Sequence, residues 1–163
     1  MRDYSECRPY IEHLVSEHRR LNSLLRQTRA SIVGSGSPDR DASGAEVAAV
    51  LQRLYDELAH HFHEEEEGGG LDEAVSRCPR VSPDVRRIET EHVELLDKVK
   101  SLIAQAAHCE ASLQERITLE TAFDDFCRQI RAHETAENEV LRQGFGANVN
   151  GEENGQPTLI LDV

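Results

Sequence analysis

The sequence has no tryptophan, only 4% aromatic residues and no apolar run near the ~20 residues that span a bilayer. Its N-terminus also lacks an apolar segment typical of a signal peptide. The four cysteines, Cys7, Cys78, Cys109 and Cys127, are far apart and form no C-x-x-C pair. Such spacing favours reduced thiols over a disulfide framework. We therefore expect a cytoplasmic protein that does not cross a membrane.

Basic residues are scarce as well. The chain has 18 lysines and arginines against 31 aspartates and glutamates, so its formal net charge at pH 7 is −13. Phosphate binding needs a basic surface, and an acidic protein does not adsorb to anionic membranes. The composition therefore argues against nucleic acid and against a membrane as partners.

The residues that are abundant favour helices. Charged residues make up 30% of the chain, and glycine is found mainly in three stretches, 34–36, 68–70 and 144–155. This profile is typical of a helical bundle rather than a sheet protein. At 163 residues the chain is long enough for one domain with a buried core.

Apolar residues recur with helical spacing in four segments. We expect helices from about Tyr10 to Arg29, from about Val47 to the glycines at 68–70, from Ser82 to about Ala106, and from about Ala111 to Gly144. Ser82 is the expected N-cap of the third helix, with Pro83 in its first turn. Residues 34–44 are typical of a loop, and residues 71–84 predict an irregular connection.

The end of the chain differs from the rest. After residue 146 the sequence is polar and glycine-rich until the apolar end TLILDV. Residues 158–161 fit either a short strand or a docked segment, and the sequence leaves that open. We expect a bundle over residues 1–146 and a short irregular C-terminal tail over residues 147–163.

Six polar residues fall on the apolar stripes of the four expected helices. They are His18, His61, Glu65, His92, His133 and Glu137. A single buried histidine is more often a hydrogen-bonded core residue than a metal ligand. Glutamate, however, is almost never fully buried unless it is paired or coordinating, and an uncompensated buried carboxylate costs several kcal/mol or more. A cation accounts for all six residues together.

Residues 58–67, LAHHFHEEEE, hold three histidines and four glutamates. In isolation this run is typical of a solvated acidic helix end. His61 and Glu65, however, continue the core stripe of the second helix, and they share a face because they are four residues apart. The histidines off the stripes are expected to be solvated; they are His13, His60, His63 and His108. Glu64 flanks the stripe and is a weaker candidate for a seventh ligand.

The pattern occurs twice in the chain. Glu17-His18 and Glu91-His92 both begin an E-H-x-x-L string, and both His61 and His133 begin an H-x-x-x-E string. The separation between the two strings is nearly the same in each half. Each helical hairpin thus contributes one histidine and then one histidine–glutamate pair. Two such hairpins packed together predict a carboxylate-bridged two-metal site with ligands from all four helices.

The ordered pattern H…HxxxE…H…HxxxE resembles the hemerythrin-like (hemerythrin HHE cation-binding) domain. The strings HFHEEEEGG, EHVELL and HETAENEVL match it locally, and the resemblance covers roughly residues 8–145. It implies an all-α, up-down-up-down four-helix bundle. It also implies a centre of two iron ions joined by an oxo or hydroxo bridge, with zinc or manganese as substitutes. By this resemblance His18, His61, His92 and His133 are terminal ligands, and Glu65 and Glu137 bridge the ions.

The third helix departs from the oxygen-carrying members of that family, which have a further histidine one turn from the third-helix histidine. The positions four residues from His92 are Ile88 and Leu96, and neither side chain can coordinate. Six protein ligands for two metal ions leave positions open for water, hydroxide or a diatomic ligand. We therefore expect ligand binding or chemistry at the metal rather than simple oxygen carriage.

Two functional classes fit these residues. The first is a non-haem di-iron protein that binds or reacts with O2, peroxide or nitric oxide, with catalase-like peroxide chemistry as one outcome. The second is an iron-sensing or iron-holding module without turnover. The sequence does not decide between them or say whether the protein is an enzyme. The expected partner is peroxide or a small diatomic molecule, and the expected state is a monomer or weak homo-oligomer.

Overall fold

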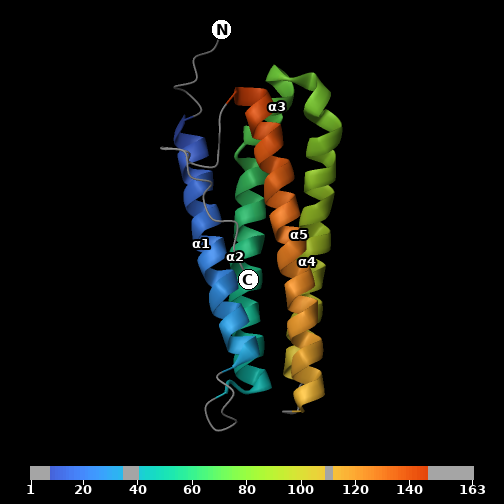
Figure 1. Ribbon diagram of the computed structural model, residues 1–163. Helices are drawn as coiled ribbons and strands as arrows, with labels where there is room; N and C mark the ends of the chain where they lie inside the picture. The colour runs from blue at the N-terminus through green and yellow to red at the C-terminus, as the bar shows by residue number, and fades with distance from the viewer. Residues whose placement is uncertain (1–7, 35–40, 109–111, 147–163) are drawn as a thin grey trace, which may run out of the picture.

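The chain folds into a bundle of four long helices (Figure 1). The computed structural model describes residues 8–34, 41–108 and 112–146. The long helices are α1 (Arg8–Val33), α2 (Gly44–Glu67), α4 (Ser82–Ala107) and α5 (Leu113–Phe145), and successive ones run in opposite directions. α2 packs against α1 and α4, and α5 packs against α4 and α1, which closes the ring. The predicted all-α, up-down-up-down four-helix bundle is confirmed.

The helix ends are set by serine and glycine. At the start of α2, the Ser43 side chain accepts a hydrogen bond from the Glu46 amide, and the Glu46 carboxylate accepts one from the Ser43 amide. This reciprocal pair satisfies amides that the first helical turn leaves free. Ser112 caps α5 in a similar way. Gly68 ends α2, as the sequence predicts, and Gly146 ends α5 with a φ of 68° that suits glycine.

The prediction of an irregular connection over residues 71–84 is wrong. Helix α3 (Gly70–Arg77) and the 3-10 turn η2 (Pro79–Val81) occupy most of this segment. α3 has only two turns, too short for a periodic pattern to stand out, but it buries Leu71 and Ala74. Ser82 is not an N-cap either, because the 3-10 turn runs directly into α4 and Ser82 is already helical.

The buried apolar side chains form two clusters, one toward each end of the bundle. The lower cluster includes Leu21, Leu58, Leu95, Phe126 and Ile130. The upper cluster, at the end where α3 lies in Figure 1, includes Leu14, Leu71, Ile88, Val140 and Leu141. Each long helix contributes to both clusters, with the exception of α2, whose buried apolar residues belong to the lower one. The layer between the clusters holds the polar residues of the stripes.

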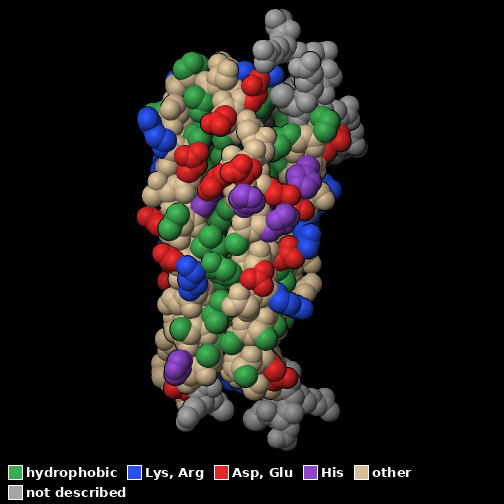
Figure 2. Space-filling model, turned by 180° about the vertical axis from the view of Figure 1, so that it is seen from behind, with side chains coloured by type: hydrophobic (Ala, Val, Ile, Leu, Met, Phe, Trp, Pro, Cys, Tyr) green, Lys and Arg blue, Asp and Glu red, His purple; other side chains and the backbone are tan. Residues whose placement is uncertain are grey.

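The surface is strongly charged. Figure 2 shows acidic and basic side chains spread over one face, with histidines gathered among acidic side chains above the middle of the molecule. In the part of the chain that the structure describes, no helix is both long enough and apolar enough to cross a membrane. Cys78 and Cys127 are free thiols. Cys7, Cys109 and the predicted tail over residues 147–163, including the segment 158–161, lie outside the described residues.

α3 lies close against α5 because residue 144 is a glycine. A Cβ atom added to Gly144 would lie 2.6 Å from the Ala74 Cβ and 2.7 Å from the Ala74 Cα. Both distances are far shorter than a normal van der Waals contact, and one of the atoms is backbone. Even a methyl group at residue 144 therefore requires α3 to move away from α5.

We expect Gly144→Ala to destabilise the fold, although alanine favours a helix over glycine by about 1 kcal/mol. Overpacking of this kind costs roughly 1–3 kcal/mol, which outweighs the gain. Urea denaturation of the two proteins measures the difference. Ala132→Gly lies at an exposed position of the same helix, so it reports only the difference in helix propensity between alanine and glycine. It should lower the free energy of unfolding by about 1 kcal/mol. A more stable Gly144→Ala protein would show that α3 is not closely packed.

Candidate metal centre

The six polar stripe residues meet in one buried layer. His18 comes from α1, His61 and Glu65 from α2, His92 from α4, and His133 and Glu137 from α5. Each has an exposed fraction of 9% or less, and Glu137 has none. The layer lies between the apolar clusters, since His18 follows Leu14 of the upper cluster and precedes Leu21 of the lower one. The structure thus brings all six predicted residues together.

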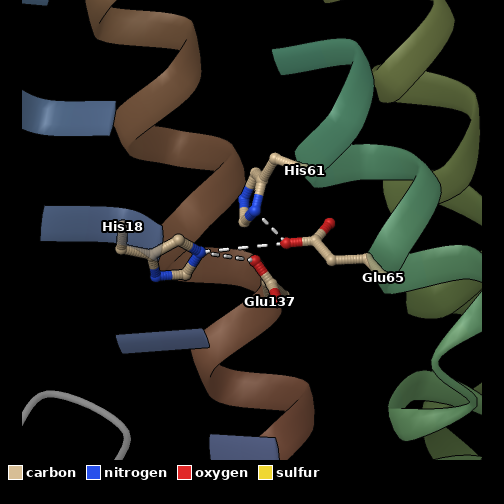
Figure 3. Close-up of side chains that lie close together, drawn as sticks. All are labelled: His18, His61, Glu65 and Glu137. Atoms are coloured by element: carbon tan, nitrogen blue, oxygen red, sulfur yellow. Dashed lines mark ion pairs between the residues drawn. The ribbon is translucent and has the colours of Figure 1, made fainter. Parts of the chain in front are cut away.

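Four of these residues form a first donor group (Figure 3). The His61 Nε2 atom lies 2.9 Å from Glu65 Oε1. The His18 Nε2 atom lies 3.4 Å from Glu137 Oε2 and 3.8 Å from Glu65 Oε1. One donor atom from each of the four side chains lies within 4.8 Å of the other three. This is the spacing of atoms that can surround one ion.

A second donor group shares Glu65 with the first. It consists of Glu65, His92 and His133, again with one donor atom each within 4.8 Å of the others. Glu65 Oε2 lies 3.2 Å from His92 Nε2, whereas Glu65 Oε1 faces His61 and His18. Glu65 thus offers one oxygen to each of the two donor groups, whereas Glu137 belongs to the first group alone. The bridging roles expected for Glu65 and Glu137 stay predictions.

Most of the donor atoms make no well-formed hydrogen bond, although Glu65 Oε1 lies 2.9 Å from His61 Nε2. Both carboxylate oxygens of Glu65 and of Glu137 are buried without one, and so are the Nε2 atoms of His18, His92 and His133. Buried polar atoms are normally hydrogen-bonded, and leaving one unsatisfied costs about 1–3 kcal/mol. Here seven such atoms face a common space. Carboxylate oxygen and imidazole nitrogen are donors for zinc, iron and manganese, so the residues fit one or two metal ions.

Two further carboxylates orient the histidines of the second group. His92 Nδ1 lies 2.7 Å from Glu66 Oε1, and His133 Nδ1 lies 3.0 Å from Glu91 Oε2. A carboxylate only accepts hydrogen bonds, so each Nδ1 atom carries the hydrogen and donates it. In the neutral form of each ring, the Nε2 atom then carries the lone pair that a metal ion would use. A carboxylate behind a metal-binding imidazole also raises the basicity of the ligand.

Phe62 fixes the same two rings by contact. Its ring stacks on His92 with centroids 4.1 Å apart and an interplanar angle of 7°. His133 meets the Phe62 ring edge-on, at 5.4 Å and 70°. Aromatic contacts of this kind hold a ring at a defined angle. The second donor group is therefore held in place before any ion binds.

The metal-free centre holds an uneven distribution of charge. Burial raises the pKa of the Glu137 carboxyl to about 7, and the nearby charge of Glu65 adds to this effect. Burial also opposes the charge on Glu65, but His18, His61 and His92 outweigh it and hold the Glu65 pKa well below its usual value. Burial works against a charged His18, yet Glu137 and Glu65 raise the His18 pKa well above normal. In the metal-free protein, ionisation is therefore less favourable for Glu137 than for Glu65.

The residues off the stripes lie outside the centre. His13, His60, His63 and His108 are exposed, as the sequence predicts. Glu64, the weaker candidate ligand, is half-exposed and turned toward His13, with 3.0 Å between the His13 Nε2 and Glu64 Oε2 atoms. It therefore belongs to neither donor group among the described residues.

Among the described residues, neither side chain one turn from His92 on α4 can coordinate a metal ion. Ile88, one turn before His92, is fully buried and belongs to that cluster. Leu96, one turn after His92, packs against the lower cluster. Within the described residues the second group has three donors and the first has four.

The supporting roles of Glu66, Glu91 and Phe62 were not predicted from the sequence. All three lie next to a stripe residue in the chain, and each acts on a histidine of another helix. Glu91 was visible only as part of the repeated E-H-x-x-L string. A glutamate directly before the stripe histidine occurs in both strings, and this repetition is the signal that points to Glu91.

Comparison with known families gives one match. A family model described as the hemerythrin HHE cation binding domain matches residues 9–141, which include all four long helices apart from the last turn of α5 and the first residue of α1. Neither a curated protein nor a solved structure gives a significant match.

The buried Glu137 leads to a pH-dependent prediction for the metal-free protein. Its pKa in the folded chain lies above the ordinary 4.5, so ionisation costs stability as the pH rises from about 4.5 through 7. Glu137→Gln cannot ionise, and the metal-free variant should be more stable than the native protein by roughly 1–3 kcal/mol at pH 8. The difference should vanish near pH 4. Denaturation at both pH values measures it.

The exposed Glu94 provides the control, because Glu94→Gln removes the same charge from a solvated position and should show no such pH dependence. The same Glu137→Gln protein should bind divalent metal more weakly, since a donor oxygen is lost. A metal-free Glu137→Gln protein less stable than the native protein at pH 8 would contradict the buried-charge cost.

Glu66 leads to a second prediction, on metal affinity. Glu66→Gln removes the charge behind His92, and losses of this type weaken metal binding by roughly 10–100-fold. Glu67→Gln, one residue further along at an exposed position, should leave the affinity unchanged. Competition with a coloured chelator measures both. Equal affinities in the two variants would show that Glu66 does not support the centre.

Proposed function

Because the chain belongs to the hemerythrin HHE cation-binding family, we propose that its six-residue centre holds two iron ions and binds or reacts with a small molecule. The ligands in this proposal are His18, His61, Glu65 and Glu137 for one ion, and His92, His133 and Glu65 for the other. The small molecule is O2, nitric oxide or peroxide. Zinc and manganese are the substitutes that the same donors accept.

The observation that carries the proposal is the position of Glu65. Its two oxygens face separate sets of histidines, 2.9 Å from His61 on one side and 3.2 Å from His92 on the other. A site for a single ion has no need of a carboxylate shared in this way. Glu65 would offer one oxygen to each of two ions, and the unpartnered nitrogens of His18, His92 and His133 would complete the two donor groups.

The protein would supply binding, orientation and exclusion of water. The apolar clusters keep the centre dry, which strengthens every electrostatic interaction inside it. Glu66, Glu91 and Phe62 hold His92 and His133 in one orientation. A pair of iron ions, when bound, supplies exchangeable coordination positions and redox change. The three-donor group beside Ile88 is where we place the position open to a small ligand.

The alternative is a module that senses or holds iron without turnover. Burial favours it, because all six donors lie in a layer that the apolar clusters cover on both sides. An ion held there is well retained. The two functions use the same residues, and reactivity of the iron-loaded protein separates them.

The test compares the native protein with Ile88→His. Metal analysis after iron loading should give two irons per chain. The native spectrum should respond to azide, nitric oxide or O2, and the protein should consume peroxide. The added imidazole lies one turn before His92 and should occupy the open position. Peroxide consumption should then be slower, and the spectral change produced by O2 should last longer.

Ile88→Leu keeps the side chain apolar and controls for repacking, since isosteric exchanges of this kind usually cost less than about 1.5 kcal/mol. It should behave like the native protein. Two irons per chain without any response to peroxide, O2, nitric oxide or azide would leave iron sensing or holding as the function. One iron per chain or fewer would overturn the proposal of a two-iron centre.

A further inference from the structure

Two histidines and a glutamate meet on the surface between α1 and α2. Glu64 of α2 is flanked by His13 of α1 and by His60 of its own helix. The His13 Nε2 atom lies 3.0 Å from Glu64 Oε2, and the His60 Nε2 atom lies 3.4 Å from Glu64 Oε1. The side chains of the two histidines are 54% and 57% exposed. These three residues are called the surface triad below.

Helix geometry builds the surface triad and separates it from the buried centre. His60 and Glu64 are four residues apart and share a face of α2. Glu65 is the next residue, and a step of about 100° along a helix turns it to a different side. Glu64 is accordingly half-exposed, whereas Glu65 is 2% exposed. The buried centre and the surface triad therefore use different donor atoms and do not compete for a side chain.

Two imidazoles and one carboxylate make a known type of donor set. Catalytic zinc sites hold their ion with two histidines and a glutamate and leave the remaining position to water. Imidazole also suits other divalent ions of the first transition series. The surroundings are acidic, because Glu64 begins a run of four glutamates at the end of α2. A negative field of this kind attracts cations.

To hold one ion, the three side chains must first turn toward a common point, because they do not form one of the donor groups already within 4.8 Å among the described residues. The two histidine nitrogens now contact opposite oxygens of Glu64. Both imidazoles are more than half exposed, so their side chains can rotate without moving the helices. The backbone positions are set by the packing of α1 on α2. A metal ion would replace two weak surface ion pairs with three coordinate bonds.

We propose that His13, His60 and Glu64 form a further site for a divalent transition-metal ion, with zinc as the best-suited ion. The site is open to solvent and holds its ion with three protein donors and water. It exchanges its ion freely, unlike the buried centre. It is independent of the function proposed for that centre.

The test is a zinc titration of the metal-free full-length chain by calorimetry, with the ion count checked by metal analysis after gel filtration at a fixed free zinc concentration. His13→Ala and His60→Ala should each bind one zinc ion fewer than the native protein. If they still bind the same number, their affinity for the most weakly bound ion should be lower than that of the native protein by roughly tenfold or more, as expected when one ligand is removed. His63→Ala and His108→Ala remove exposed histidines outside the surface triad and should bind as many ions as the native protein.

Proton NMR gives a second measurement that does not depend on stoichiometry. Zinc should shift the imidazole resonances of His13 and His60 and leave those of His63 and His108 in place. If all four variants bind zinc like the native protein, or if the His13 and His60 resonances do not respond, the surface triad is only a pair of ion pairs. Neither result affects the buried centre, because Glu137→Gln reports on that site separately.

Discussion

The carboxylates of Glu65 and Glu137 impose the constraint on which this bundle depends. Their oxygens are buried between two apolar clusters without hydrogen-bond partners, and charge in such a place is expensive. Four imidazoles and a cation offset this free-energy cost of buried charge only if all four long helices place their donors at one level. A shift of one helix by a single turn, about 5.4 Å, would take its donor out of reach. The centre therefore fixes the register of the bundle as much as the bundle fixes the centre.

One helical turn accounts for the varied uses of the acidic run on α2. Successive residues point about 100° apart, so four adjacent glutamates face four directions. Glu65 points inward to the donors, Glu66 reaches α4 and bonds to His92, and Glu64 turns toward His13 of α1. Glu67 is exposed. The run is thus neither a plain solvated helix end nor a simple row of ligands, and its composition alone would not distinguish the four roles.

Much of the centre was predictable because its residues obey the helical period over long segments. His61 and Glu65 continue a stripe that begins at Val47, and such a stripe identifies the buried face. Glu66 and Glu91 were not predictable in this way, since their partners belong to neighbouring helices and depend on how those helices are rotated. α3 was missed for a different reason. Two turns do not make a period, and the nearby prolines favoured a loop, whereas its helical form is stabilised by packing on α5.

The position of the centre between two apolar clusters also has a consequence for rates. The donors have little access to solvent while the four helices stay packed: His18 is 9% exposed, and the other five residues are 3% exposed or less. Entry and departure of an ion then require the bundle to part, at least at one helix, and such openings are rare in a stable core. An ion bound at this centre should therefore exchange more slowly than an ion at an exposed site, and its occupancy should lag behind changes in the free metal concentration.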